Sequence, residues 1–465
     1  MQVVIVGAGM VGTQLARYLI QEKHDVSIIE PDEERARHVS NRLDCLVLNE
    51  SGNNLNTLEE AGIAKADALV CVTESDELNM IICGLADSRY PNITKIARVR
   101  NDEYVKLNKT GERVLGIDFF VHPDIEASRS VITAIEHGAM GNIIAFSDTP
   151  YELGSIDVAG ESVFDGLPLT EFRTKVTEDC IVTLIERNGE SLLPSGSTVL
   201  SKGDRIHVLA DSEKLNGIFE MAGEKKKPIR KIGIVGGGRM GILIAEGLLE
   251  QEKKKTFSIL SVFKKMGTQP GRRIVIIERD YGICKELAAR FPQALILNED
   301  ISDESFVAEE RINDLDLIVT TTENQELNMI AAIYLKSLGV DRTISMVSGS
   351  GYATIARQLG VDVVIPMKSV VVDSILSHLM GSGVKDVHRI GDGSIGIIEL
   401  EIREYAQILG KPLTGFRLST GGLVMLVKRG DHSFIPQRDY VFTQGDLIVL
   451  IANNGAEMEI EKLFG

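Results

Sequence analysis

Near the start of the chain stands VIVGAGMVG (residues 4–12), an apolar run that passes directly into a glycine pattern. The pattern returns as GIVGGGRMG at residues 233–241. In each copy the first glycine permits a tight turn, the second lets the backbone approach a pyrophosphate, and the third allows a helix to pack closely on its strand. The helix N-terminus then offers amide donors to a phosphate. Both copies therefore predict a strand–turn–helix unit that binds a nucleotide.

The two halves of the chain share further short sequences, so the chain is a tandem repeat. The matching pairs are SIIE at 27–30 with VIIE at 275–278, LNE at 48–50 with LNE at 297–299, TESDELNM at 73–80 with TENQELNM at 322–329, and PLTEFR at 168–173 with PLTGFR at 412–417. Because the last pair lies far from the glycine pattern, we expect each repeat to contain a second domain.

Apolar runs and turn residues predict the fold of each domain. Short apolar runs alternate with helical patterns after each glycine pattern, which is typical of a doubly wound parallel sheet buried on both faces. From Ile156 to Ala210 and from Ile397 to Ile451, short strands separated by turn residues predict a small α+β domain. The runs expected as strands in the first repeat are Val3–Val6, Val26–Ile29, Cys45–Leu48, Ala68–Val72 and Ile96–Val99, with helices at Gly12–Gln21 and Asp76–Ser88.

A chain of 465 residues exceeds the size of a single hydrophobic core, so several domains are expected. The sequence GEKKKP at 223–228 has the glycine, charge run and proline of a linker. The predicted units are a Rossmann-type α/β domain at 1–135, a small α+β domain at 136–222, a linker at 223–230, a second Rossmann-type domain at 231–378 and a second α+β domain at 379–465.

Composition limits the class of protein. The formal net charge of −17 argues against a general nucleic-acid surface, which needs concentrated basic residues. No apolar stretch approaches the roughly 18 to 20 residues that span a bilayer, and no secretion signal precedes the first strand. The five cysteines are scattered without metal-site spacing, which fits a reducing cytoplasm. We therefore expect a cytoplasmic protein that binds no nucleic acid and does not cross a membrane by itself.

An acidic residue ends the second apolar run of each repeat, Glu30 in the first and Glu278 in the second. In this position a carboxylate accepts hydrogen bonds from ribose hydroxyls. Because a carboxylate disfavours a 2′-phosphate, the sequence predicts NAD(H) or an adenosine nucleotide rather than NADP.

Thr73 ends the fourth apolar run, at the sheet edge where ligands bind in such folds. Asp76 and Glu77 open the helix that follows. Two roles stay open for this segment, contact with a ligand and capping of the helix, since acidic residues also favour a helix N-terminus.

Arg98 and Arg100 lie at the end of the fifth apolar run and share one face of the strand, so either could pair with a phosphate or lie in solvent. The second repeat has Met346 and Ser348 at these positions. The difference predicts two unequal nucleotide sites, although Arg239 in the second glycine loop and Arg279 next to Glu278 could approach a phosphate from the other side.

With these motifs in order, the chain resembles the regulator-of-potassium-conductance family, also called RCK or KTN, and its tandem form is similar to the TrkA-type subunits of Trk potassium uptake. The resemblance implies a non-catalytic regulatory subunit in a homo-oligomeric, tetrameric ring that gates a membrane potassium transporter of the TrkH type. It also implies NAD(H), with ATP or ADP possible, at both glycine patterns. LNES at 48–51 departs from a Gly-Asp-Ala/Gly pattern common in the family, and Met346 replaces an arginine.

The resemblance implies two groups of cofactor-binding residues, one in each repeat. The first group is Gly7, Ala8, Gly9, Met10, Val11, Gly12, Glu30, Glu50, Ser51, Thr73, Glu74 and Arg98. The second group is Gly236, Gly237, Gly238, Arg239, Met240, Gly241, Glu278, Glu299 and Thr322.

The second repeat contains an insertion at about 252–273, in which lysine and arginine alternate with apolar residues. A basic amphipathic segment of this kind can face anionic lipid or a partner protein. An exposed surface loop is the other interpretation.

Two rival functions remain. An NAD-dependent dehydrogenase would need a proton-transfer residue beside the nicotinamide and a sizeable substrate domain, and the sequence offers neither. The other rival keeps the nucleotide sensor but assigns it to another cation channel or to an antiporter, because fold alone does not determine function.

Overall fold

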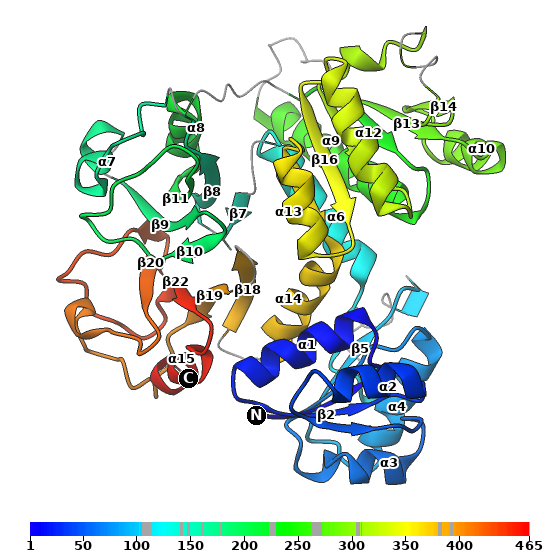
Figure 1. Cartoon of the computed structure of the whole chain (residues 1–465), viewed down its shortest axis with the longest axis vertical. Coiled ribbons are helices and arrows are strands. Elements are labelled where there is room, and N and C mark those ends of the chain that lie inside the picture. Colours follow the sequence, from blue (N-terminus) through cyan, green and yellow to red (C-terminus); the bar gives the residue numbers. More distant parts are fainter. Residues whose placement is uncertain are drawn as a thin grey trace.

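The computed structural model describes residues 1–101, 103–104, 113–139, 143–146, 149–159, 162–176, 179–222, 229–262, 272–303, 307, 309–379, 384–390 and 394–464, without the side chains of residues 173, 253–262, 457, 458 and 461. Two parallel sheets and two antiparallel sheets make up this part of the chain (Figure 1). The predicted linker falls mostly outside the described residues, at 223–228, as do residues 263–271 of the insertion.

The first parallel sheet has the strand order β3-β2-β1-β4-β5-β6, which confirms the doubly wound fold. Its strands lie within two residues of the predicted apolar runs: β1 (Gln2–Val6), β2 (Asp25–Ile29), β3 (Leu46–Leu48), β4 (Ala68–Cys71), β5 (Thr94–Arg98) and the further strand β6 (Phe119–Val121). The helices are α1 (Met10–Gln21), α2 (Glu33–Ser40), α3 (Leu55–Glu60), α4 (Asp76–Asp87) and α6 (Pro123–Glu136). The strand order reverses between β1 and β4, because successive strands are added on one side of β1 as far as β3 and on the other side from β4 onward. Folds of this type bind ligands at this point.

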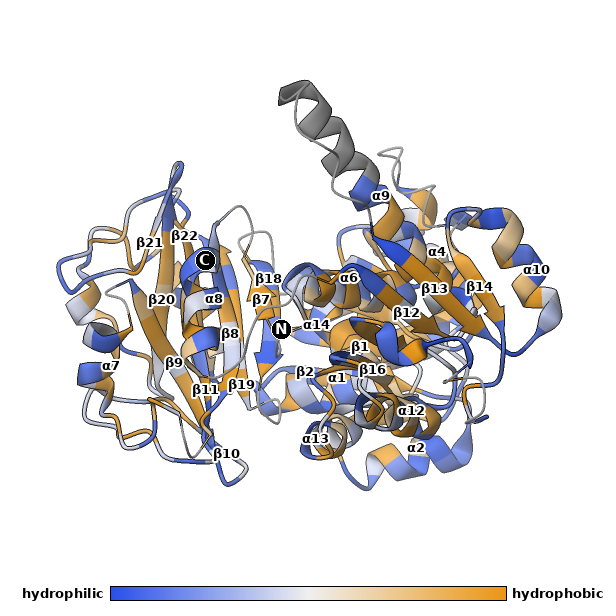
Figure 2. Cartoon of the chain, turned by 90° about the horizontal axis from the view of Figure 1, so that it is seen from above, coloured by the Kyte–Doolittle hydropathy of each residue, from blue (hydrophilic) through white to orange (hydrophobic). Residues whose placement is uncertain are grey.

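The second parallel sheet repeats this topology in the order β14-β13-β12-β15-β16-β17. Its strands are β12 (Lys231–Val235), β13 (Arg273–Glu278), β14 (Leu295–Asn298), β15 (Leu317–Thr320), β16 (Arg342–Val347) and β17 (Val363–Pro366). The helices are α9 (Arg239–Val262), α10 (Tyr281–Arg290), α12 (Gln325–Ser337), α13 (Ser350–Gln358) and α14 (Met367–Leu379). Both sheets are made of the continuous apolar strands that the sequence predicted (Figure 2).

Each parallel sheet is followed by a small antiparallel sheet with short helices, as expected. The first contains β7 (Ile143–Ala145), β8 (Tyr151–Asp157), β9 (Cys180–Arg187), β10 (Glu190–Leu192) and β11 (Arg205–Asp211), with α7 (Leu169–Lys175) and α8 (Ser212–Met221). The second contains β18 (Val384–Ile390), β19 (Ile395–Glu401), β20 (Gly422–Arg429), β21 (His432–Phe434) and β22 (Leu447–Asn453), with α15 (Glu457–Phe464). Short 3-10 turns lie at Ile63–Lys65, Val114–Gly116, Ile312–Asp314 and Leu413–Gly415.

The two small domains pack against each other through one shared apolar core. Leu184 and Leu209 of the first sheet lie in the same buried cluster as Ile397 and Met425 of the second. The two antiparallel sheets therefore form one unit beside the two parallel-sheet domains (Figures 1 and 2).

Two helices are exchanged between the repeats. Helix α6 follows the first parallel sheet, yet its Val131 and Ile135 belong to the apolar core of the second sheet. Helix α14 follows the second sheet, yet its Val372 and Ile375 belong to the core of the first. Figure 1 shows α6 and α14 side by side between the two parallel-sheet domains. The apolar core of each parallel-sheet domain is thus completed by a helix from the other repeat.

Across the part of the chain that the structure describes, we find no helix with the length and apolar character needed to cross a bilayer.

Candidate functional site

Both glycine loops have the geometry that the sequence predicted. Gly7 has φ +109° and Gly236 has φ +103°, values that favour glycine. A Cβ atom on Gly12 would lie 2.0 Å from the carbonyl oxygen of Gly7, so the helix can approach the strand only without a side chain there. The matching distance from Gly241 to the Gly236 oxygen is 2.1 Å.

The middle glycine of each loop faces open space instead. A Cβ atom on Gly9 or on Gly238 would meet no described atom within 4 Å. Gly9 also caps α1 without any side-chain hydrogen bond to the first amides of the helix. These amides and the empty space beside Gly9 are what a phosphate requires.

The predicted ribose-binding acids are held at the rim of these loops. One carboxylate oxygen of Glu30 accepts from the Ala8 amide at 2.6 Å, and the other accepts from Asp32 N at 3.1 Å. Glu278 accepts from the Gly237 amide at 2.7 Å in the same way. Each carboxylate oxygen keeps a lone pair for a further donor. Both acids are therefore oriented toward the loop before any ligand arrives.

A repeated asparagine secures the strand ends behind these acids, and the sequence analysis did not single it out. Asn49 Nδ2 donates to the carbonyl oxygens of Glu30 and Pro31, at 2.9 and 3.0 Å. Asn298 makes the equivalent hydrogen bonds to Glu278 and Arg279. The repeat of LNE in the sequence was the signal that could have revealed this role.

Thr73 forms hydrogen bonds with Asn79, within the same motif. Its backbone N–H and its hydroxyl both donate to Oδ1 of Asn79, at 2.9 and 2.7 Å. Asn79 is buried, and its Nδ2 donates to the carbonyl oxygens of Thr73 and Arg98. Asn328 repeats all four hydrogen bonds with Thr322 and Met346. This asparagine therefore joins the ends of two neighbouring strands to the helix between them.

The first turn of α4 holds the loop after β5. Ser75 is the N-cap of α4, since its hydroxyl accepts from the Leu78 amide at 3.1 Å. Asp76 Oδ2 instead accepts from the backbone N–H groups of Arg100 and Asn101, at 2.7 and 2.8 Å. In the second repeat Gln325 takes this position and accepts from Ser348 N at 3.0 Å.

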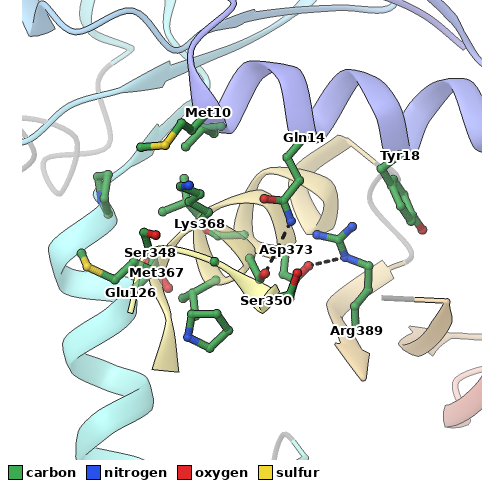
Figure 3. Close-up of a pocket in the computed structure, with 18 of the residues that line it drawn as sticks. Met10, Gln14, Tyr18, Glu126, Ser348, Ser350, Met367, Lys368, Asp373 and Arg389 are labelled. Carbon is green, nitrogen blue, oxygen red and sulfur yellow. Dashed lines mark hydrogen bonds and ion pairs between the residues drawn. The ribbon is translucent and has the colours of Figure 1, made fainter. Parts of the chain in front are cut away.

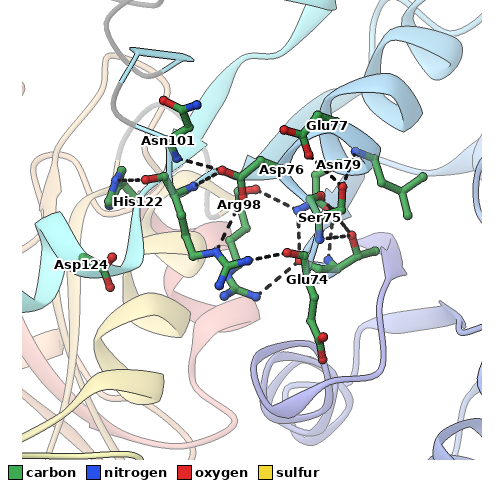
Figure 4. Close-up of polar contacts among 12 residues, drawn as sticks. Glu74, Ser75, Asp76, Glu77, Asn79, Arg98, Asn101, His122 and Asp124 are labelled. Atoms are coloured by element: carbon green, nitrogen blue, oxygen red, sulfur yellow. Dashed lines mark hydrogen bonds and ion pairs between the residues drawn. The ribbon is translucent and has the colours of Figure 1, made fainter. Parts of the chain in front are cut away.

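Arg98 is the half-buried cation of the first site. Its Nη1 lies 3.4 Å from the Thr73 oxygen, while its Nε has no hydrogen-bond partner among the described atoms. Burial lowers the pKa of the Arg98 guanidinium. Arg100 lies beside it and donates from Nη2 to the carbonyl oxygen of Glu74, so both arginines reach the same loop (Figure 4). Arg98 thus retains a donor that an anion could use.

A cavity of about 2030 Å³ opens beside the first glycine loop. The candidate residues that line it are Gly7, Ala8, Gly9, Met10, Val11, Glu30, Ser51, Thr73, Glu74 and Arg98. Gly12 lies beneath the loop, and Glu50 accepts from the Thr57 hydroxyl at 2.7 Å. Arg35, which the sequence analysis missed, also lines the cavity and pairs with Glu74 at 3.2 Å. None of the second repeat's candidate residues lines this cavity.

The second glycine loop contacts the exchanged helix α6. Arg239 Nε lies 3.1 Å from Oδ2 of Asp124, in the first turn of α6. Its Nη2 also lies 2.8 Å from Nε2 of His122. His122 Nδ1 accepts from the Ile125 amide, so the proton is on Nε2, which donates to the Arg100 oxygen at 2.9 Å. The hydrogen-bonding partner of Arg239 here is therefore Asp124.

The remaining candidates of the second repeat lie close to the second loop. The Glu299 amide donates to the carbonyl oxygen of Glu278 at 3.1 Å.

Within the basic insertion, Arg272 is described, and it pairs with Glu136 of α6 and, at 3.8 Å, with Glu252. Arg272 thus joins the insertion to α6.

Two family models match the chain, each of them twice and in alternating order. The TrkA-N domain matches residues 3–123 and 232–366, and the TrkA-C domain matches residues 153–223 and 397–465. The chain belongs to the TrkA family. Within this family, the two parallel-sheet units are TrkA-N domains and the two antiparallel-sheet units are TrkA-C domains.

Relatives in the TrkA family match the whole chain. The chain is 28% identical over 470 residues to Trk system potassium uptake protein TrkA homolog 1 of Methanosarcina mazei, with 100% of each chain covered. It is 27% identical over 471 residues to Trk system potassium uptake protein TrkA of Haemophilus influenzae, covering 100% of this chain and 98% of that one.

Solved structures share the TrkA fold at low sequence identity. A GsuK channel bound to NAD is 17% identical with a TM-score of 0.57, covering 100% of this chain and 78% of the channel. The crystal structure of the GsuK RCK domain is 16% identical with a TM-score of 0.56, covering 100% and 94%. The likeness establishes the tandem RCK fold, in agreement with the resemblance seen in the sequence.

Proposed function

We propose that the chain is a non-catalytic nucleotide sensor that regulates a membrane potassium transporter. The observation that carries this proposal is the full-length similarity to proteins named as Trk potassium uptake components. The client is a TrkH-type membrane subunit, and the chain lies at the cytoplasmic face of the membrane through this partner.

The geometry of the glycine loops supports NAD(H), or ATP and ADP, as the ligands. Open space beside Gly9 and Gly238 leaves room for phosphate, and Glu30 and Glu278 are fixed where a ribose would lie. The NAD-bound channel with the same fold is consistent with this class of ligand.

Exposed apolar side chains on α12 and at the end of α13 support assembly of the chain into a ring of four copies. Ile330 of α12 is 63% exposed, while Ile355 and Leu359 on the adjoining helix are 49% and 57% exposed. Buried residues of the two helices share one apolar cluster, so these exposed side chains lie on neighbouring helices. Light scattering of the purified chain tests the ring, and Ile330→Glu with Leu359→Glu should lower its mass.

A nucleotide panel followed by transport measurements tests the function. The purified chain is titrated with NAD⁺, NADH, ADP, ATP and NADP, and potassium flux is then measured in vesicles holding a TrkH-type subunit. We expect flux to depend on both the chain and the bound nucleotide. Flux that is the same with and without the chain would contradict the proposal.

Two further arms separate the rival functions. Incubation with NADH and small keto acids should leave NADH unoxidised, whereas turnover would favour a dehydrogenase. Co-purification with an antiporter or another cation channel, in place of a TrkH-type subunit, would assign the sensor to that client.

A further inference from the structure

The exchanged helix α14 brings a lysine of the second repeat to the first glycine loop. Helix α14 begins at Met367, directly after β17, and packs on α1. The Nε2 of Gln14 on α1 lies 3.4 Å from the hydroxyl of Ser369 on α14. Lys368 precedes Ser369 and lines the same cavity as Gly7, Gly9 and Met10. Figure 3 shows Lys368 and Met10 facing each other across this cavity.

Among the described residues, Lys368 has no acidic partner. The Lys368 side chain is half-buried, and this burial lowers the pKa of its amine. The carboxylates that line the same side of the cavity are already engaged: Glu126 pairs with Arg129 at 2.9 Å, and Asp373 pairs with Arg389 at 2.6 Å. No ion pair of Lys368 occurs among the described residues. A partly buried cation without a counter-charge attracts an anion from solution.

The second glycine loop has the opposite arrangement of charge. Strand pairing shows which residues of the two repeats are equivalent, since Arg98 pairs with Val121 as Met346 pairs with Ile365. Asp124 in α6 lies three residues after Val121, and Lys368 in α14 lies three residues after Ile365, so Asp124 and Lys368 occupy equivalent positions. In the second loop Asp124 meets Arg239 at 3.1 Å and the two charges cancel. In the first loop the equivalent of Arg239 is Met10, which lies across the cavity from Lys368, so no described side chain there cancels the charge of Lys368.

We propose that the first nucleotide site is composite, with Lys368 of the second repeat binding the phosphate chain of an adenosine nucleotide that has at least two phosphates. The inference rests on the proposed nucleotide binding and adds the source of its phosphate specificity. The glycine loop and the amides of α1 hold one phosphate, and Lys368 donates to the next. A bound ligand thereby fastens α14, and with it the strand β18 that follows, onto the first domain.

Calorimetric titration of the full-length protein with AMP, ADP and ATP tests this inference. Lys368→Gln should weaken the tighter class of ATP and ADP sites by roughly tenfold or more, because a charge-assisted hydrogen bond is lost, while AMP changes by less than about threefold. Lys368→Arg should restore most of the ATP affinity. The matched control is Lys385→Gln, because Lys385 faces the same cavity from β18 but already pairs with Glu401 at 3.8 Å.

The outcomes distinguish failure of nucleotide binding from failure of the composite site. An unaltered protein that binds no nucleotide rejects the proposed function itself. Binding of ATP by the unaltered protein, with equal losses for ATP and AMP in Lys368→Gln or with no loss at all, overturns the composite site alone.

A second measurement needs no variant. Lysine acetylation of the unaltered protein is followed by mass spectrometry, with AMP or ATP present at saturation. ATP should protect Lys368 from acetylation while AMP leaves it reactive. Equal reactivity of Lys368 with both nucleotides overturns the inference.

Discussion

Asp124 on α6 and Arg239 in the second glycine loop form an ion pair across the two repeats, with 3.1 Å between Oδ2 and Nε. The same helix end carries His122, whose Nε2 donates to the carbonyl oxygen of Arg100 beside the first site. One helix N-terminus therefore contacts parts of both candidate nucleotide sites. A ligand that moved the Arg100 loop would also act on the second glycine loop, because both contact the N-terminus of α6. This gives the tandem repeat a physical route for coupling its two sites.

Substitution of two glycines in the first loop separates ligand binding from folding. Gly12→Ala places a methyl group 2.0 Å from the Gly7 oxygen and should strongly destabilise the first domain. Gly9→Ala meets no described atom within 4 Å, so the free energy of unfolding should change by less than about 1 kcal/mol. Nucleotide binding should nevertheless be lost in Gly9→Ala, because the methyl group occupies the space for phosphate. Urea unfolding and calorimetry measure the two effects, and normal binding by Gly9→Ala would contradict the site.

The sequence predicted the local features of this site and missed the long-range ones. Glycine geometry and the position of Glu30 depend on residues close in the chain, so a motif with the right spacing suffices. The exchange of α6 and α14 could not be predicted, because an amphipathic helix shows its apolar face but not which of two similar sheets covers it. Lys368 and Asp124 gain their importance only through that exchange, and therefore the sequence alone gave no signal for either.

Asn79 should be important for stability even though it lies in the motif first considered for ligand contact. It is buried and makes four hydrogen bonds to Thr73 and Arg98. Asn79→Ala leaves several of these groups unpaired and should cost roughly 2 to 4 kcal/mol of unfolding free energy. The matched control Asn56→Ala, at an exposed helix position, should change it by less than about 0.5 kcal/mol. Similar losses in the two variants would reject the role of Asn79 as a junction between strands.

Glu30 should select a ribose with a free 2′-hydroxyl. Its carboxylate accepts from the Ala8 amide at 2.6 Å, which holds the side chain in place. A 2′-phosphate would therefore be repelled by this fixed negative charge. Glu30→Gln should weaken binding of NAD(H) or ATP, with a smaller effect on NADP. Titration with NAD⁺ and NADP measures both, and equal affinity of the unaltered protein for the two would reject this assignment.

His24 should make the first domain less stable in acid. Burial, followed by the Met1 amine 3.1 Å away, lowers the pKa of His24 from 6.5 to about 4. Below pH 6.5 the unfolded chain takes up a proton that the folded protein refuses, so stability falls as the pH falls toward 4. From pH 6.5 to 5 the loss should reach at most about 2 kcal/mol. Denaturant unfolding of His24→Gln at pH 7, 6 and 5 should show a shallower slope than the unaltered protein, and parallel slopes would contradict this.

The two nucleotide sites should differ in affinity because of Arg98. In the first site its buried Nε has no hydrogen-bond partner among the described atoms, whereas the second site has Met346 at the same place in the sheet. Arg239 does not make up the difference while it is paired with Asp124. A charge-assisted hydrogen bond to phosphate contributes roughly 1.5 to 3 kcal/mol, so the second site should bind ATP one to two decades more weakly.

Titration with ATP should therefore resolve two classes of site, and the first repeat should fill first. Arg98→Ala should bring the tighter class toward the weaker one. Met346→Ala is the matched control, since it removes a side chain of similar length without a charge and should leave both classes nearly unchanged. Two identical affinities that Arg98→Ala does not alter would show that this arginine plays no part in binding. If Asp124→Asn then strengthens the weaker class, release of Arg239 from its ion pair supplies the second site with the phosphate ligand that it lacks.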